Sequence, residues 1–287
     1  MDQTSPQTME SSGYHPQNLM KPSATKLFKQ SFQILKSDKE LALFPILAAV
    51  LSVIGGAIVF GVFLLAKHSQ TNGSNSGFNA LFIFIYYLVE YYILIYFGCG
   101  LAACVLSTFE GNKPSFSYGI SVANQHKGTI FGYAVLAAIV GVIFRVVAER
   151  FGWVGEIVAG ILGIAWSLAT VFIAPVLITT DLKPVEAVKE SAKIFKATWG
   201  NTVKGAVGFG LIGILGVVVA LVPGVAFVAI GSKGLAATGI IISIVLIVAV
   251  SIIVSTCSAI YRTALFHYAT HKTVPEGFDQ SLQLAVR

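Results

Sequence analysis

WSLATVFIAPVLITTDLKPVEAVKESAKIFKATWGNTVK, residues 166–204, decides how the rest of the chain is interpreted. It begins in an apolar run, passes through a charged segment and enters a second apolar run. We interpret it as the end of one membrane helix, a charged connection and the start of another membrane helix. The full 287-residue chain fits this interpretation, because 55% of its residues are hydrophobic and only 11% are charged. Since roughly a quarter of the residues of a soluble domain are charged, we expect this protein to be embedded in lipid.

Six stretches are long and apolar enough to cross a bilayer as helices, which takes about 20 residues each. They are residues 41–66, 80–106, 129–147, 154–179, 203–230 and 235–261. We therefore predict an all-α membrane protein with six transmembrane helices in one domain, residues 24–268. A disordered polar tail, residues 1–23, precedes this domain, and a short cytoplasmic tail, residues 269–287, follows it. Within the spans, Pro175 and Pro223 are expected to bend or end a helix.

The basic residues are distributed unevenly between the two sides of the predicted membrane. Six spans place both termini on the same side, and fifteen of the 19 Lys and Arg residues lie on that side. Three lie on the opposite side, and Arg145 lies within a span. By the positive-inside rule, this asymmetry predicts a cell-membrane protein with both termini in the cytoplasm. Orientation thus explains the net charge of +6, and we infer no nucleic-acid partner.

Two segments on the cytoplasmic side, residues 24–39 and 184–197, alternate apolar and basic positions at helical spacing. The lysines of their polar faces are Lys26, Lys29, Lys36, Lys189, Lys193 and Lys196. We predict that both segments are amphipathic interfacial helices that lie in the headgroup layer and bind anionic lipid. The lipid bilayer is therefore the expected partner, and a protein partner or a homo-oligomer is the alternative that the sequence leaves open.

Similar segments follow three of the predicted spans. They are TFEGNKPSFSYGIS (108–121), TTDLKPVEAVKES (179–191) and ATHKTVPEGFDQS (269–281). Lys21-Pro22 opens a looser N-terminal copy. These matches indicate a unit of one interfacial helix and a two-span hairpin, used three times, with a fourth short interfacial segment at the C-terminus, and chance similarity of Lys-Pro dipeptides is the alternative. In the fifth span, glycines that include Gly213 and Gly216 fall mostly on one face, which favours packing between helices of the same chain over a dimer interface.

Glu90 is the most informative ionisable residue, because it lies about ten positions into its span. At 1.5 Å per residue it is roughly 15 Å deep, close to the middle of the bilayer. A charge there costs several kcal/mol unless it is paired, protonated or hydrated. Glu90 therefore either forms an intramembrane polar site or is a protonated glutamate packed among tyrosines. Arg145 either reaches inward to Glu90 or turns outward to Glu149.

No motif for catalysis, nucleotide binding or cofactor binding is present in the sequence. His267 and His271 have the four-residue spacing of helical metal ligands, but no nearby carboxylate or cysteine completes a ligand set. Histidines at the membrane interface explain the pair more simply. We therefore predict no catalytic residue, no metal and no cofactor, and we do not expect an enzyme.

Two blocks of the sequence resemble a known family. The first block is SFQILKSDKELALFP (31–45). The second contains Trp166, Pro175-Val176-Leu177, Glu186-Ala187, Ser191 and FKATWG (195–200), which includes Trp199 and Gly200. They resemble the signature segments of a family of prokaryotic multi-pass membrane proteins of unknown function, over roughly residues 26–268. The resemblance implies the same architecture and a carboxylate after the Pro-Val-Leu element, for which Asp181 is the nearest candidate, but no particular activity.

Two functions are compatible with these observations. The first is a non-enzymatic protein that organises the membrane, senses it or binds a partner there, which the basic interfacial helices favour. The second is a transporter or channel for a small solute or lipid, which the depth of Glu90 and the helix breaks at prolines favour. Transport predicts that Glu90 lines a water-accessible cavity together with polar groups from at least two other spans.

Overall fold

The computed structural model describes residues 24–68, 76–230, 233–279 and 282. Over these residues it contains helices and their connections, with no β-strand. The elements are α1 (Ala24–Ser37), the short 3-10 helix η1 (Lys39–Ala42), α2 (Leu43–His68), α3 (Ser76–Phe109), α4 (Phe116–Gln125), α5 (Lys127–Arg150), α6 (Gly152–Ala169), α7 (Ile173–Thr179), α8 (Pro184–Ala229) and α9 (Lys233–His271). The predicted disordered tail, residues 1–23, lies outside the described residues.

Six helices in the described part of the chain are long and apolar enough to cross a membrane. The candidate spans are Lys39–Lys67, Gly77–Phe109, Lys127–Arg150, Gly152–Ala169, Val207–Ala229 and Gly234–His271. The all-α fold with six spanning helices is therefore confirmed. The physical reason is that hydrocarbon offers the backbone no hydrogen-bond partner, so each spanning segment forms its backbone hydrogen bonds within itself. The turn from α5 to α6 is tight, and Gly152 occupies it with a φ of +55° that other residues rarely adopt.

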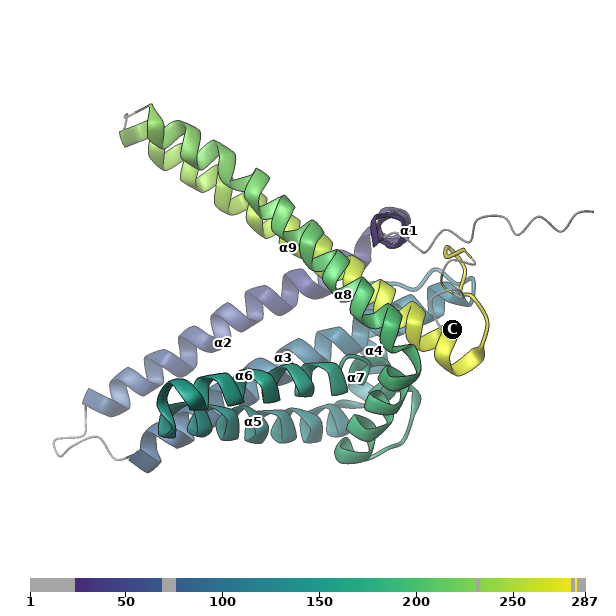
Figure 1. Ribbon diagram of the computed structural model, residues 1–287, viewed down its shortest axis with the longest axis horizontal. Coiled ribbons are helices and arrows are strands. Elements are labelled where there is room, and N and C mark those ends of the chain that lie inside the picture. Colours follow the sequence, from purple (N-terminus) through teal and green to yellow (C-terminus); the bar gives the residue numbers. More distant parts are fainter. Residues whose placement is uncertain (1–23, 69–75, 231–232, 280–281, 283–287) are drawn as a thin grey trace, which may run out of the picture.

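The spans pack as three helix pairs, α2/α3, α5/α6 and α8/α9, and α3 also lies against α5. In Figure 1 the α8/α9 pair runs at a steep angle to α2, and the pairs spread apart from the end where the C-terminus lies. The halves of α8 and α9 far from that end expose large aliphatic side chains, among them Val219 and Ile241. Apolar surface of this extent suits contact with lipid chains.

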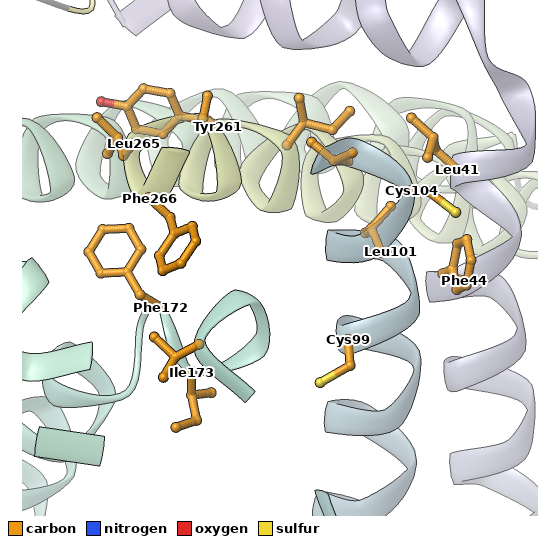
Figure 2. Close-up of a cluster of buried hydrophobic side chains, with 14 of the residues drawn as sticks. Leu41, Phe44, Cys99, Leu101, Cys104, Phe172, Ile173, Tyr261, Leu265 and Phe266 are labelled. Atoms are coloured by element: carbon orange, nitrogen blue, oxygen red, sulfur yellow. The ribbon is translucent and has the colours of Figure 1, made fainter. Parts of the chain in front are cut away.

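The buried core is concentrated at the end where the three pairs meet. Figure 2 shows this region, with Phe172 close to Phe266 of α9, and Phe44 of α2 beside α3. All three phenylalanines are buried. The three cysteines of the chain are also buried there and form no disulfide: Cys99, Cys104 and Cys257. The end where the pairs converge, rather than the ends where they spread apart, therefore holds the helices in their relative positions.

Glycines of the fifth span pack against another helix of the same chain, as the sequence predicts. A side-chain carbon at Gly213 would lie 3.5 Å from Val254 of α9, and one at Gly216 would lie 2.6 Å from Val250. Close approach of this kind increases van der Waals contact between helices in lipid, where the hydrophobic effect contributes little. The glycine face of α8 is thus used within the chain.

One predicted boundary is wrong, because residues 184–197 and the fifth span form a single helix, α8. The helix also continues through Pro223, where the sequence predicts a bend or an end. The N–H of Gly224 donates a hydrogen bond to Ser243 Oγ on α9 at 2.8 Å. Serine side chains on neighbouring helices often satisfy backbone groups that a membrane-helix proline disturbs. The neighbouring helix therefore compensates for a residue that would end an isolated helix.

The fourth predicted span, residues 154–179, is broken, but the break precedes Pro175. α6 ends at Ala169 and α7 begins at Ile173. The N–H of Ile173 donates to the carbonyl of Thr170 at 3.0 Å, so the chain passes through a tight turn. Pro175 lies in the first turn of α7, where the missing N–H leaves few helix bonds unmade.

The order of elements agrees with the predicted repeat. α1 precedes the pair α2/α3, and α4 precedes the pair α5/α6. In the third unit, the basic segment is fused to the first helix of its pair as the start of α8. Short helices at the converging end and spanning pairs thus alternate along the chain.

The described part of the C-terminal tail packs back onto the helices. Phe278 and Leu282 are buried, and the rings of Phe278 and Phe109 of α3 lie 6.2 Å apart. Asp279 forms an ion pair with Lys26 of α1. This segment therefore contacts both α1 and the end of α3.

Candidate functional site

α1 presents its three lysines to the outside while its opposite face is covered by protein. Its buried residues are Leu27, Ser31, Ile34 and Leu35. They face α8 and α9, and Phe28 packs edge-on against Phe209 of α8 at 5.4 Å between ring centroids. Lys26, Lys29 and Lys36 are exposed. The apolar residues Leu27, Ile34 and Leu35 of α1 are therefore packed on protein, whereas Phe32 is exposed.

The first turns of α8 repeat this arrangement. Pro184 occupies the start of the helix, and the Glu186 carboxylate accepts a hydrogen bond from the N–H of Lys183 at 3.3 Å. The buried positions of this segment are Ala187, Ser191, Ile194, Phe195 and Thr198. The exposed positions include Lys189, Lys193 and Lys196. The apolar side packs on protein here as well, and the position of both segments in the headgroup layer stays a prediction.

We call the six exposed lysines of α1 and α8 the basic surface. Two of them form ion pairs, Lys26 with Asp279 and Lys193 with Glu190, the latter at 3.3 Å. The other four take part in none of the ion pairs found among the described residues: Lys29, Lys36, Lys189 and Lys196. Exposed ion pairs contribute roughly 0–1 kcal/mol, so these lysines contribute little to holding the fold.

Glu90 lies in α3 against α2 and is half-buried. A side-chain carbon at Gly56 of α2 would lie 3.4 Å from Glu90 Oε1 and 3.6 Å from the Tyr86 ring. Glu90 takes part in none of the ion pairs found among the described residues. The two cavities that meet at Arg262, considered below, do not include Glu90 in their linings.

Arg145 turns toward Glu149 and not toward Glu90. Its Nε donates to Glu149 Oε1 at 2.7 Å, one turn along α5, and both side chains are exposed. The outward alternative for Arg145 is therefore the one that the structure contains. Glu90 and Arg145 do not form one polar site.

The residues of the second resemblance block are spread along α6, α7 and α8. Trp166 is half-buried in α6 and Pro175 is buried in α7, while Asp181 is exposed in the connection to α8. Trp199 and Gly200 lie in α8, but their side-chain environment is outside the described part of the structure. The described members of this set lie along the α6–α7–α8 connection.

Within this connection, Phe172 immediately precedes α7. Its N–H donates to the buried Ser191 Oγ of α8 at 3.1 Å. This bond joins the break in the fourth span to α8, and it gives Ser191, part of the same block, a structural role.

His267 and His271 stack on each other at the C-terminal end of α9, with ring centroids 4.5 Å apart. The His271 ring nitrogen Nδ1 lies 2.8 Å from the hydroxyl of Thr270. No group of three or more potential metal ligands occurs among the described residues. The two histidines therefore contact each other through their rings, and His271 also contacts Thr270.

A polar cavity of about 580 Å³ lies between the end of α1, η1, the α3–α4 connection and the C-terminal segment. Its charged lining residues are Asp38, Glu40, Lys113 and Glu276. Burial raises the pKa of Asp38 above its ordinary value, the nearby charge of Glu40 acts in the same direction, and a hydrogen bond from the Glu40 N–H opposes both. Asp38 accepts that bond at 3.1 Å and caps η1, so its role here is structural.

The residue that sequence reasoning missed is Arg262. Arg262 is one of the fifteen basic residues on the side of the termini. Because the positive-inside rule already explains its charge, the sequence suggests no other role for it. α9 continues to His271, so Arg262 lies inside a helix and between elements of the core. The available signal is that Arg262 directly follows a long apolar run, residues 235–261, without a turn residue.

Comparison with known families is informative over most of the chain. Residues 77–276 match a family described as of unknown function, DUF6159. The chain belongs to DUF6159. The match contains the second resemblance block, whereas residues 31–45, the first block, lie outside it. No curated protein and no solved structure matches the chain. Membership in DUF6159 therefore supports the membrane architecture and leaves the activity to be inferred from the residues.

Proposed function

We propose that this DUF6159 protein is a non-enzymatic membrane protein that binds anionic headgroups through its basic surface. It would organise or sense the cytoplasmic leaflet of the cell membrane, with both termini in the cytoplasm. The observation that carries this proposal is that α1 and the first turns of α8 expose lysines while their apolar faces are already packed on protein. The charge is therefore available to lipid without rearrangement of the fold.

The expected strength of this interaction is modest for each residue and considerable for the set. A basic side chain near an anionic membrane surface contributes about 1 kcal/mol, and the attraction falls off within a Debye length. The four lysines without an ion pair among the described residues thus provide most of the attraction. The apolar outer halves of the helices fix the protein in the bilayer at a constant depth, which keeps the basic surface near the headgroups.

We test this proposal with full-length protein in vesicles of phosphatidylcholine that contain a small amount of dansyl-labelled phosphatidylserine. Energy transfer from the tryptophans reports enrichment of the labelled anionic lipid near the protein. We expect replacement of all six lysines of the basic surface by glutamine to abolish most of the transfer above that seen with dansyl-labelled phosphatidylcholine. Added salt should reduce the wild-type signal in the same way.

The matched control is the double variant Lys67→Gln and Arg150→Gln, which removes exposed cations from the opposite ends of the spans. It should retain the wild-type signal. If the six-lysine variant enriches phosphatidylserine as strongly as the wild type, the proposed function is wrong.

Transport through Glu90 is the alternative, and one observation favours it. Glu90 lies at mid-span and takes part in none of the ion pairs among the described residues. If the protein binds headgroups and does not transport, proteoliposomes that contain a pH-sensitive dye should show the same proton flux for the wild type and for Glu90→Gln. A wild-type flux above that of empty vesicles that disappears in Glu90→Gln would favour transport.

A further inference from the structure

Arg262 is a half-buried cation of α9 in the packed part of the molecule. Its Nε donates to the carbonyl of Ser258, one turn earlier in α9, at 3.2 Å. None of the ion pairs found among the described residues includes Arg262. A guanidinium carries five N–H donors in a planar fork, and one backbone carbonyl satisfies only one of them. Arg262 is half-buried, and a partly buried charge without a counter-charge is less favourable than a paired one, so this position favours an external anion.

Two cavities meet at this side chain. The first, of about 460 Å³, lies between α8 and α9 and is bounded by residues such as Phe209, Val217 and Val254. The second, of about 540 Å³, lies between α2, α3, α7 and α9. Both volumes are in the range of roughly 300–1,000 Å³ that is typical of ligand sites. The residues shared by the two linings are Val171, Ser251, Ser255 and Arg262.

Most of the lining residues are apolar, and the others are Arg262, Thr170, Thr263 and serines of α9. In the second cavity, aliphatic residues such as Leu94, Leu101 and Ile247 dominate. Neither lining contains an aspartate or a glutamate. Hydroxyl groups that donate and accept hydrogen bonds are placed near the charge by Ser255 and Ser258. One positive charge, a few hydroxyls and two apolar recesses are complementary to an amphiphile with an anionic head.

The depth of the site agrees with this assignment. Arg262 lines the second cavity together with Phe44 and Pro45, which belong to the first turn of α2 at the membrane boundary. From there the lining extends along α9 to Ile247, which is fifteen residues away in the sequence and about 22 Å away at 1.5 Å per residue. The hydrocarbon core is about 30 Å thick, so the cavity runs from headgroup level past the middle of the bilayer.

We propose that the paired cavities bind one anionic diacyl phospholipid from the leaflet on the side of the two termini. The phosphate contacts the Arg262 guanidinium, whose fork geometry suits bidentate binding of phosphate oxygens. One acyl chain lies in the first cavity and the other in the second, on either side of the residues that the two linings share. A soluble anion would leave both apolar linings uncovered, and a neutral lipid would leave the guanidinium unpaired. This site does not depend on the basic surface, because the two share no residue.

The test uses native mass spectrometry of the full-length protein in detergent, titrated with dioleoyl phosphatidylglycerol, dioleoyl phosphatidylcholine or oleate. We expect one phosphatidylglycerol to bind to the wild type at least tenfold more tightly than phosphatidylcholine. Arg262→Gln should lose this preference, and Arg262→Lys should retain part of it because it keeps the charge without the fork. Arg150→Gln, which removes an exposed cation far from the cavities, should bind like the wild type.

A second variant keeps the proposal testable if Arg262→Gln does not fold. Val248→Trp enlarges a half-exposed residue that lines the second cavity and leaves Arg262 in place. It should weaken binding of phosphatidylglycerol more than binding of oleate, which needs only one recess. Equal binding of phosphatidylglycerol to the wild type and a folded Arg262→Gln would overturn the proposal, as would wild-type binding of oleate in preference to phosphatidylglycerol.

These experiments can disprove either lipid proposal without disproving the other. Loss of the phosphatidylserine enrichment without loss of the single bound phosphatidylglycerol supports the basic surface and the Arg262 site as independent features. If the six-lysine variant loses the bound phosphatidylglycerol, the assignment to Arg262 is wrong, because those lysines do not line either cavity.

Discussion

Gly119→Ala is expected to lower the free energy of unfolding by about 1–3 kcal/mol, the usual cost of adding carbon to a packed core. Gly119 is buried in α4 and faces α3. A side-chain carbon there would lie 2.6 Å from the carbonyl oxygen of Gly100 and 2.8 Å from Cys104 Sγ. It would also lie 2.5 Å from Phe44 Cζ. The backbone oxygen cannot move aside as a flexible side chain can, so α3 and α4 must separate.

The measurement is thermal unfolding in detergent. A thiol-specific fluorophore, which reacts with the buried cysteines when they become exposed, reports the unfolding. Gly119→Ala should unfold at a lower temperature than the wild type. Gly128→Ala is the matched control, because a side-chain carbon at Gly128 would meet nothing within 4 Å. Alanine is also the better helix former, so the control should be neutral or slightly stabilising. Unfolding of both variants at the same temperature would show that the α3–α4 contact is not tightly packed.

This contact also shows what the sequence does not reveal about a membrane fold. The six spans are predictable, because lipid requires long uninterrupted apolar helices. Which face of each helix contacts another helix is much less predictable, since lipid-facing and protein-facing residues are both apolar. Gly100 and Gly119 are two of 28 glycines in the chain, and only the structure identifies them as a point of contact.

The amphipathic segments were predictable as helices but not in their environment. The periodicity of α1 is the same whether its apolar face lies on lipid or on protein, and Leu27 and Leu35 are in fact buried against other helices. Residues 184–197 differ from the fifth span in charge, and that difference suggests two elements. Charge does not interrupt backbone hydrogen bonding, however, so the helix runs from Pro184 to Ala229 without a break.

Charged residues in the candidate sites illustrate the same limit. Depth in the span identifies Glu90 from the sequence alone, because no topological rule accounts for a carboxylate at mid-span. Arg262 lies at the end of an apolar run, where the positive-inside rule accounts for any arginine. Its relation to the two cavities depends on how three helix pairs converge, and no periodicity within one helix contains that information.

The second large effect on stability is expected at Ser191, which contacts the break in the fourth span. The break separates α6 from α7, so the N–H groups at the start of α7 have no helical partner. Ser191 is fully buried in α8, and its Oγ accepts the hydrogen bond from the N–H of Phe172. Phe172 is itself fully buried in the core, so water cannot replace this acceptor.

Ser191→Ala should therefore destabilise the protein by about 1–3 kcal/mol, the cost of leaving a buried donor without a partner. Thermal unfolding in detergent measures the loss, and hydrogen exchange at the N–H of Phe172 locates it, since this N–H should exchange faster in the variant. Ser37→Ala is the control, because the Ser37 hydroxyl is exposed and donates only to the carbonyl of Gln33 in its own helix. Its unfolding temperature should stay at the wild-type value. If Ser191→Ala unfolds like Ser37→Ala and exchange at Phe172 is unchanged, then the packing of Phe172 against α9, rather than the hydrogen bond to α8, fixes the break.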